Sequence, residues 1–181
     1  SEEPVFALNL KYTGETVASK LSRIREEMKK AGATAHVLTT LDDICWTLNI
    51  RGNDIEFFPL VLSYAVITMD KVDLYINEAK LNSEIKADLE KDGVVLHPYN
   101  DIYEDIKKTA SDEVLLIDPA RLNYALYNNI PEGVAKVEER NPEILFKAIK
   151  NEVEIENIRK AQIKDSVAHV KFMKWLKENV G

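Results

Sequence analysis

The side chains that could carry out acid–base or metal chemistry are few and far apart in this 181-residue chain. Its three histidines, His36, His97 and His169, lack the H-x-x-x-H or similar spacing that places two zinc ligands on one element. Ten residues lie between Asp101 and Asp112, the D-x10-D spacing of two carboxylates in some dinuclear metallohydrolases. No histidine and paired glutamates follow them at strand positions. We therefore assign no catalytic and no metal-binding residue to this chain.

The motifs of nucleophilic and cofactor chemistry are also missing from the sequence. Cys45 is the only cysteine, which excludes an intramolecular disulfide and a multi-cysteine zinc site. It falls on the inner face of a predicted short helix without a basic neighbour, so we expect a buried apolar residue. Six scattered glycines form no phosphate-binding loop and no G-x-S-x-G turn. No cofactor-binding residue is assigned.

The densest group of polar residues lies between positions 42 and 54. Its candidates for a structural or inter-lobe role are Asp43, Trp46, Asn49, Arg51, Gly52 and Asp54. In one interpretation Arg51 binds a carboxylate, because a guanidinium pairs with anions through two parallel hydrogen bonds. In the other, Arg51 neutralises one of the aspartates at 42, 43 and 54 and caps a helix end. We favour the structural interpretation, and contact of Arg51 with another lobe stays open.

Hydrophobic periodicity predicts a regular alternation of helices and strands around this group. Helices are expected over residues 16–30, from a Thr40–Asp43 capping box to near 52, and over 81–90, 101–109, 119–128 and 144–150. Strands are expected over residues 34–38, 60–68, 72–76, 93–96, 114–117 and 134–138, with an edge strand near 5–8. The two strands at 60–68 and 72–76 form an antiparallel hairpin. The fold class is therefore α/β, a mixed sheet with helices on both faces.

A long C-terminal helix is predicted after this unit. Asn151 and Glu154 form a capping box, and neither glycine nor proline occurs between Glu152 and Asn179. The helix would be about 42 Å long, and its apolar residues spread over most of its circumference. Because such a helix needs cover on several sides, we expect it to fold back onto its own lobe or to pair with a second copy.

Composition and charge exclude several classes of protein. The net charge of −7 argues against a sequence-independent grip on nucleic acid or anionic lipid. The longest strongly apolar run, near residues 61–67, is far shorter than a membrane span. Ser1 to Pro4 show no signal-peptide pattern. We expect a cytoplasmic protein that binds neither nucleic acid nor membrane.

The middle of the chain reads L-D-D-I-C-W-T-L-N-I-R-G-N-D-I over residues 41–55 and F-P-L-V-L-S-Y-A-V-I over 58–67. These segments resemble the three-domain Xaa-Pro aminopeptidases, the pita-bread metallopeptidases known as aminopeptidase P. The lead-in over residues 4–25 is similar to the start of the middle domain of that family. Residues 147–176, with Trp175-Leu176, are similar to the entry into its catalytic domain. The resemblance covers nearly the whole chain.

The resemblance implies that residues 1–150 are a creatinase-N-like lobe and that residues 151–181 are the first helix of a truncated catalytic domain. The implied parent is a cytosolic homodimer that removes the residue preceding proline from a peptide substrate. It would use two divalent metal ions, commonly manganese, whose ligands lie after Gly181. The implied partners are therefore an N-terminal lobe, the catalytic domain and the peptide.

Two functions remain open at this point. In the first, the chain is a non-catalytic scaffold lobe of a metallo-aminopeptidase that limits which peptides reach the catalytic pocket. In the second, it is a peptidase-like interaction module without catalysis. A self-sufficient metal hydrolase is disfavoured because no ligand set is present.

Overall fold

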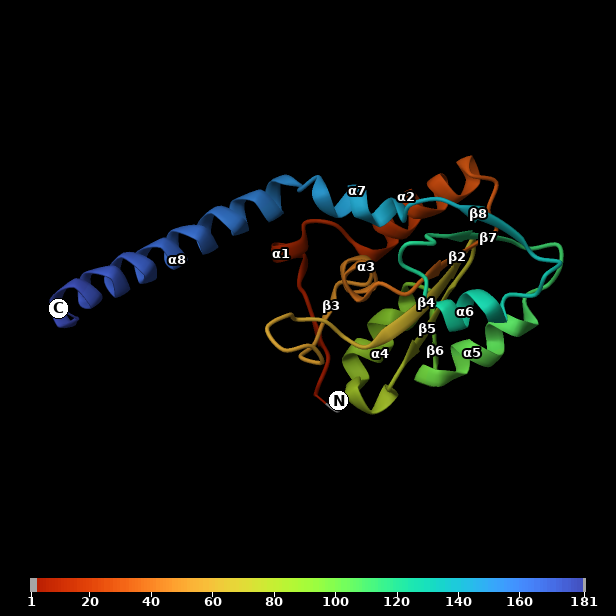
Figure 1. The fold of residues 1–181 in the computed structure, drawn as a ribbon, viewed down its shortest axis with the longest axis horizontal. Helices are drawn as coiled ribbons and strands as arrows, with labels where there is room; N and C mark the ends of the chain where they lie inside the picture. The colour runs from red at the N-terminus through yellow and green to blue at the C-terminus, as the bar shows by residue number, and fades with distance from the viewer. Residues whose placement is uncertain (1–2, 181) are drawn as a thin grey trace.

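A mixed sheet forms the centre of the structure, a computed structural model that describes residues 3–180 (Figure 1). Its strands are β2 (Ala35–Leu38), β4 (Ser63–Thr68), β5 (Val72–Ile76), β6 (Val94–His97), β7 (Val114–Ile117) and β8 (Ala135–Glu138). The spatial order is β6-β5-β4-β2-β7-β8. β4 runs antiparallel to both of its neighbours, while the other pairs are parallel. A separate antiparallel ribbon joins β1 (Phe6–Ala7) to β3 (Ile50–Arg51).

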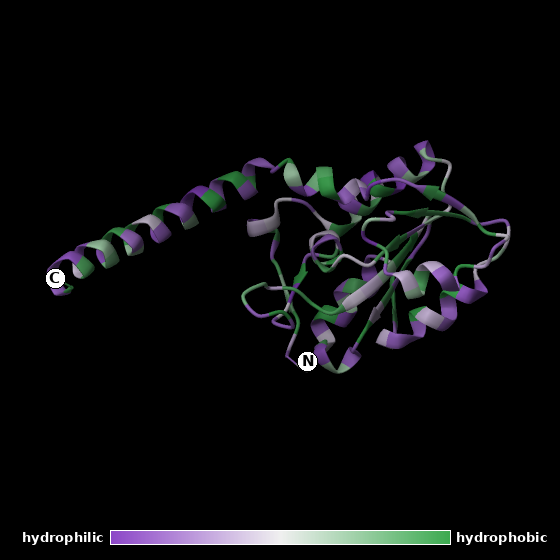
Figure 2. Cartoon of the chain, in the orientation of Figure 1, coloured by the Kyte–Doolittle hydropathy of each residue, from purple (hydrophilic) through white to green (hydrophobic). Residues whose placement is uncertain are grey.

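Helices cover both faces of the sheet. They are α1 (Leu10–Thr13), α2 (Val17–Lys30), α3 (Leu41–Thr47), α4 (Ser83–Lys91), α5 (Ile102–Asp105), α6 (Tyr124–Asn129), α7 (Pro142–Ala148) and α8 (Glu152–Asn179), with 3-10 turns η1 (Glu78–Lys80), η2 (Tyr99–Asp101) and η3 (Ile106–Lys108). α2, α3 and α4 bury their apolar side chains in one core, and α5 and α6 bury theirs in a second core on the other face. The hydrophobic strands of Figure 2 lie between these layers. The predicted α/β fold class is confirmed.

Local signals explain why most elements begin and end where they do. Thr16 caps α2 by accepting a hydrogen bond from the Ser19 amide, and Gly32 follows with a φ of 71° that other residues rarely adopt. Leu21, Ile24 and Met28 then recur at helical spacing and are almost fully buried. The expected helix at 16–30 and the hairpin β4–β5 are both confirmed.

Three local expectations are wrong. The helix expected from Thr40 to near residue 52 ends at Thr47, and Ile50–Arg51 form β3 instead. The helix expected over residues 119–128 forms only from Tyr124, because Asn123 caps it there by accepting a bond from the Leu126 amide. Thr40 begins α3 without a capping box. Its hydroxyl donates to the Asp43 carboxylate, which also pairs with Lys147 of α7 and accepts a bond from Asn141. Asp43 therefore connects α3 to α7 instead of capping the first turn of α3.

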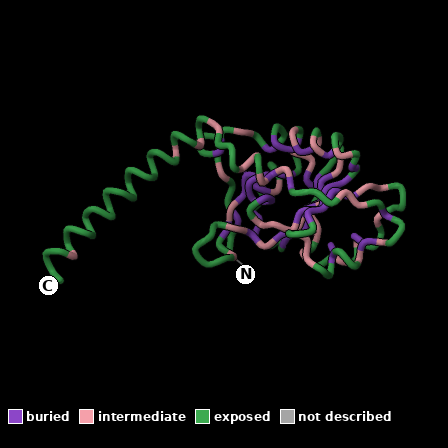
Figure 3. Tube along the Cα trace, turned by 45° about the horizontal axis from the view of Figure 1, so that its top comes forward, coloured by how far each residue is buried: buried purple, intermediate pink, exposed green. Residues whose placement is uncertain are grey.

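The helix α8 leaves the body of the molecule and is exposed along its whole length (Figures 1 and 3). Its 28 residues and its capping box, formed by Asn151 and Glu154, are as predicted. Its exposed apolar side chains are Val153, Ile155, Ile158, Ile163, Val167, Val170, Phe172, Met173 and Trp175. The expectation that α8 folds back onto its lobe is wrong. Pairing with a second copy stays a prediction.

The direction of α8 is set at its first turn. Asn151 donates a 2.8 Å hydrogen bond to the Thr13 carbonyl, and Asn157 donates one of the same length to the Lys11 carbonyl. Gly14 makes this approach possible, because a Cβ there would clash with the side chains of Asn151 and Val153. A continuous helix held in this way cannot reverse toward the lobe.

Within residues 3–180, none of the helices combines the length and the hydropathy that a membrane span requires.

A buried histidine and glutamate connect the sheet to α7. His36 of β2 lies 3.3 Å from the Glu143 carboxylate through Nε2 and 3.0 Å from the Leu116 carbonyl through Nδ1, and both side chains are inaccessible. Burial alone would lower the pKa of His36, but the Glu143 charge, its hydrogen bond and the carbonyl outweigh burial and raise the pKa above its usual value. With two acceptors beside it, the ring is held as the charged imidazolium.

This pair predicts a pH dependence of stability. A group whose pKa is raised on folding contributes stability that is complete below its unfolded pKa, near 6.5, and is lost as pH rises through the folded pKa. The stability difference between the natural chain and Glu143→Gln is therefore expected to be largest below about pH 6.5 and to shrink as the pH rises through the raised pKa of His36. Urea unfolding at several pH values measures it. A difference that grows with pH would contradict the charged pair.

Candidate functional site

The residues predicted as candidates gather where α3 passes into β3. Asn49 makes the turn with a φ of 53°, a conformation that asparagine tolerates better than most residues. Its backbone carbonyl accepts a 2.7 Å bond from Leu8, and its side-chain amide donates to the Glu15 carbonyl at 3.0 Å. Trp46 is 7% exposed, and its ring lies 6.4 Å from that of Phe146. The turn therefore ties the lead-in segment to α3 and to the ribbon of β1 and β3.

Lys20 of α2 joins the candidate residues, although the sequence analysis did not single it out. Lysine is seldom buried, but Lys20 is 1% exposed. Its ammonium donates 2.7 Å bonds to the Trp46 carbonyl and to Oδ1 of Asn49, and lies 4.3 Å from the centre of the Trp46 ring. A signal was present, since position 20 falls on the apolar stripe of α2, three residues after Val17 and four before Ile24.

The Lys20 ammonium is held without a carboxylate partner among the described residues, because both of its hydrogen-bond acceptors are neutral oxygens. Burial lowers its pKa from the usual value to about 8. The carboxylates of Glu15 and Glu154 oppose that shift from a distance, while Arg51 and Arg23 add to it. A nearby anion would therefore stabilise the charged form of Lys20 in this position.

Arg51 caps the end of α3, as the structural interpretation predicted. Its Nη1 donates to the carbonyls of Cys45 at 2.7 Å and Ile50 at 2.8 Å. The same interpretation expected Arg51 to neutralise one of the aspartates at 42, 43 and 54. This expectation is wrong, since no ion pair joins Arg51 to a carboxylate among the described residues. The nearby aspartates are taken by lysines from other elements. Lys147 pairs with Asp42 and Asp43, and Lys80 pairs with Asp54.

The buried Asp54–Lys80 pair fixes the loop between β3 and β4. Both side chains are 2% exposed or less, and Oδ2 of Asp54 also accepts a 2.7 Å bond from the Leu62 amide. Gly52 allows the loop to pack closely, because a Cβ there would lie 2.8 Å from Cγ2 of Val61. A charged pair at the base thus holds a loop whose tip is apolar.

That tip carries exposed aromatic residues on a strained backbone. Phe57 is 91% exposed and Phe58 61% exposed. Phe57 has a φ of 69°, which is an outlier for a bulky residue and costs on the order of 1–3 kcal/mol. Strain and exposed apolar surface together are typical of a contact surface.

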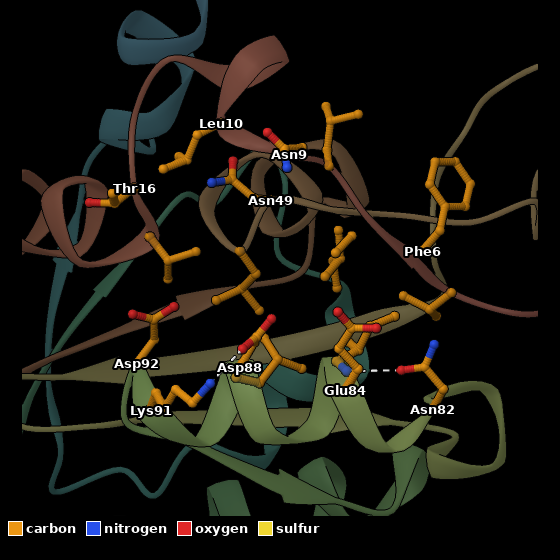
Figure 4. Close-up of a pocket in the computed structure, with 18 residues that line it drawn as sticks. Phe6, Asn9, Leu10, Thr16, Asn49, Asn82, Glu84, Asp88, Lys91 and Asp92 are labelled. Atoms are coloured by element: carbon orange, nitrogen blue, oxygen red, sulfur yellow. Dashed lines mark hydrogen bonds and ion pairs between the residues drawn. The ribbon is translucent and has the colours of Figure 1, made fainter.

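Two hollows of opposite charge flank the Asn49 turn. We call the first the basic hollow: about 300 Å³ between α1, α3 and α8, whose charged lining residues are Lys20, Arg51, Lys150 and Glu154. The second, the acidic groove, has about 620 Å³ between α4 and the segment after β1 (Figure 4). Glu84, Asp88 and Asp92 point into it from one face of α4.

Metal binding has no support in the arrangement of the side chains. No group of three or more His, Cys, Asp or Glu side chains that could hold a metal ion occurs within residues 3–180. Cys45 is buried, and burial raises the pKa of its thiol, which keeps it protonated.

Comparisons with known proteins assign a family to this arrangement. Residues 1–154 match the creatinase/prolidase N-terminal domain. Xaa-Pro aminopeptidase 1 of Dictyostelium discoideum is 41% identical over 178 residues, which are 97% of this chain and 28% of that protein. The chain thus spans less than a third of the length of this relative.

Solved structures agree with the sequence match. The X-prolyl aminopeptidase of Caenorhabditis elegans, described as a cytosolic enzyme with a di-nuclear active site, superposes with a TM-score of 0.92 at 34% identity. The match covers 98% of this chain and 30% of that one, so it includes nearly all of α8. An Xaa-Pro dipeptidase of Bacillus anthracis shares the fold over 87% of this chain and 44% of its own, with a TM-score of 0.59 at 18% identity. The chain belongs to the creatinase/prolidase N-terminal domain family.

Proposed function

We propose that this chain is a non-catalytic lobe of a metal-dependent Xaa-Pro aminopeptidase. In this proposal residues 1–150 form the lobe and residues 151–181 begin the catalytic domain. The parent removes the residue preceding proline from a peptide, and the lobe holds the domains around the pocket and limits which peptides enter. Relatives that carry this activity by name, and that are more than three times as long as this chain, support the proposal.

The observation that carries the proposal is the course of α8. The helix exposes apolar side chains along 28 residues, yet it leaves the lobe as the corresponding segment does in the much longer C. elegans enzyme. Free apolar surface of this extent is unusual on a protein that functions alone. A following domain that packs on α8 would cover it.

The loop between β3 and β4 supports the same arrangement. It projects from the side of the lobe from which α8 also leaves (Figures 1 and 3), and its tip carries the exposed Phe57 and Phe58. One neighbouring domain can therefore contact both. We propose that the candidates at the base of this loop, Asp43, Trp46, Asn49, Arg51, Gly52 and Asp54, hold the surface in shape for that contact.

The metal ions of the proposed parent would be bound outside this chain. The C. elegans enzyme has a di-nuclear site, and manganese is the metal we expect in the parent. The residues described here do not fit such a site, because their carboxylates are committed to lysines or stand apart. A cytosolic location and a homodimeric parent are further parts of the proposal.

A peptidase assay tests the proposal. The purified 181-residue chain, supplied with Mn²⁺ and an Xaa-Pro peptide, is expected to show no turnover, while the full-length protein of the same gene cleaves the peptide. Metal-dependent cleavage by the chain alone would refute a non-catalytic role. A full-length protein that binds partners but leaves the peptide intact would refute the peptidase and favour the interaction module.

A further inference from the structure

In the basic hollow, the positively charged lining residues outnumber the carboxylates that line it. Lys20, Arg51 and Lys150 line it, and Glu154 is the one carboxylate that lines it among the described residues. That carboxylate already accepts a 2.9 Å hydrogen bond from the Asn151 amide as part of the capping box. The hollow is therefore left with an excess of positive charge beside a buried ammonium.

Arg51 has unused hydrogen-bonding capacity at this hollow. One terminal nitrogen, Nη1, donates to the carbonyls of Cys45 and Ile50, which fixes the plane of the guanidinium. The Nη2 and Nε groups donate to no residue within the described part of the chain. A guanidinium held by one nitrogen, with the three N–H groups of Nε and Nη2 left over, is preorganised to bind a carboxylate.

The rest of the lining restricts the size and character of a ligand. About 300 Å³ is at the lower limit of small-molecule pockets. Trp46, Tyr12 and Ile158 supply an apolar border. The space therefore suits a carboxylate on a short aliphatic body better than a phosphate ester or a large anion.

We infer that the basic hollow is a binding site for a carboxylate, which Arg51 contacts directly while the buried Lys20 and the exposed Lys150 stabilise its charge. The carboxylate belongs either to a small free ligand or to an aspartate or glutamate side chain from elsewhere in the full-length protein. Both present the same chemistry to Arg51. The inference rests on the geometry of this chain and holds whether or not the parent cleaves Xaa-Pro peptides.

The test uses Trp46 as a reporter, because its ring lies 4.3 Å from the Lys20 ammonium. Trp175, the other tryptophan, is replaced by phenylalanine, and propionate is titrated at constant ionic strength with chloride as the reference anion. A saturable change in Trp46 emission is expected. Arg51→Gln is expected to weaken binding at least about tenfold, since hydrogen bonds to a charged group are lost.

A matched control separates binding from structure. Arg25 also donates to two backbone carbonyls, those of Thr68 and Lys71, but lies away from the hollow. Arg25→Gln is expected to leave propionate binding unchanged even where it lowers the melting temperature. Binding is also expected to weaken as pH rises through about 8, where Lys20 loses its proton, with Glu15, Glu154, Arg51 and Arg23 the charged groups that act on it.

The outcomes are decisive in each arm. An unsaturable response, or equal responses in Arg51→Gln and the natural chain, would overturn the site. When saturable binding is found, the same titration on the full-length protein identifies the source of the carboxylate. A response there indicates a free ligand. Its loss there indicates that a side chain of the full-length protein already fills the hollow.

Discussion

Replacing Asp54 with asparagine is expected to lower the free energy of unfolding by about 3–5 kcal/mol, because it leaves the Lys80 ammonium buried without its carboxylate. Both side chains are 2% exposed or less. The asparagine side chain keeps the size of the aspartate and can still accept a hydrogen bond from the Leu62 backbone N–H. The loss of stability therefore reports the removal of the charge. Since small domains are stable by only about 5–15 kcal/mol, the effect would be a large share of the total. Urea unfolding followed by circular dichroism measures it.

Two further variants make this result specific. Asp88→Asn removes an exposed ion pair with Lys91 and is expected to change stability by less than about 1 kcal/mol. Adding Lys80→Met to Asp54→Asn removes the unpaired charge and is expected to restore part of the loss. If Asp54→Asn is as stable as Asp88→Asn, the buried pair does not hold the loop.

The exposed face of α8 is expected to make the 181-residue chain associate in solution. Covering about 400 Å² of apolar surface on each of two copies would contribute on the order of 20 kcal/mol before costs. The loss of translational and rotational freedom and the ordering of side chains offset about 4–15 kcal/mol or more of this contribution. Weak pairing at micromolar concentrations is therefore expected, and light scattering is expected to show a mass above the monomer.

The contrast variants lie on one helix. Phe172 and Trp175 stack with ring centres 6.4 Å apart, and both are 54% exposed. Replacing both with glutamine, or ending the chain at Lys150, is expected to give a monomer. Replacing the exposed Lys174 and Glu178 with glutamine is the control and is expected to leave association intact. A natural chain that stays monomeric at high concentration would contradict the idea.

Short-range signals in the sequence were sufficient for most of the fold. The alternation of helices and strands, the hairpin β4–β5 and the full extent of α8 follow from apolar period, caps and glycines. The start of α6 did not, because Asn123 offered a cap five residues inside the expected helix. Local capping choices of this kind are nearly equal in energy, and packing decides between them.

The candidate site was harder to predict because its partners are distant in sequence. The density of polar residues at 42–54 made this cluster a candidate, but its charges are paired with Lys80 and Lys147, which no local pattern connects to it. Lys20 could not be recognised as buried from its residue type, because lysine is seldom buried, although its position on the apolar stripe indicated burial. The direction of α8 depends on a contact between Asn151 and Thr13 that spacing alone does not reveal.

In the full-length protein, we expect a neighbouring domain to cover α8. Hydrogen–deuterium exchange of the α8 amides, measured in the dilute 181-residue chain and in the full-length protein, tests this expectation. Fast exchange is expected over the exposed part of α8, from Ile158 to Trp175, in the 181-residue chain, and strong protection of the same segment is expected in the full-length protein. Equally fast exchange of this segment in both proteins would mean that no domain covers α8.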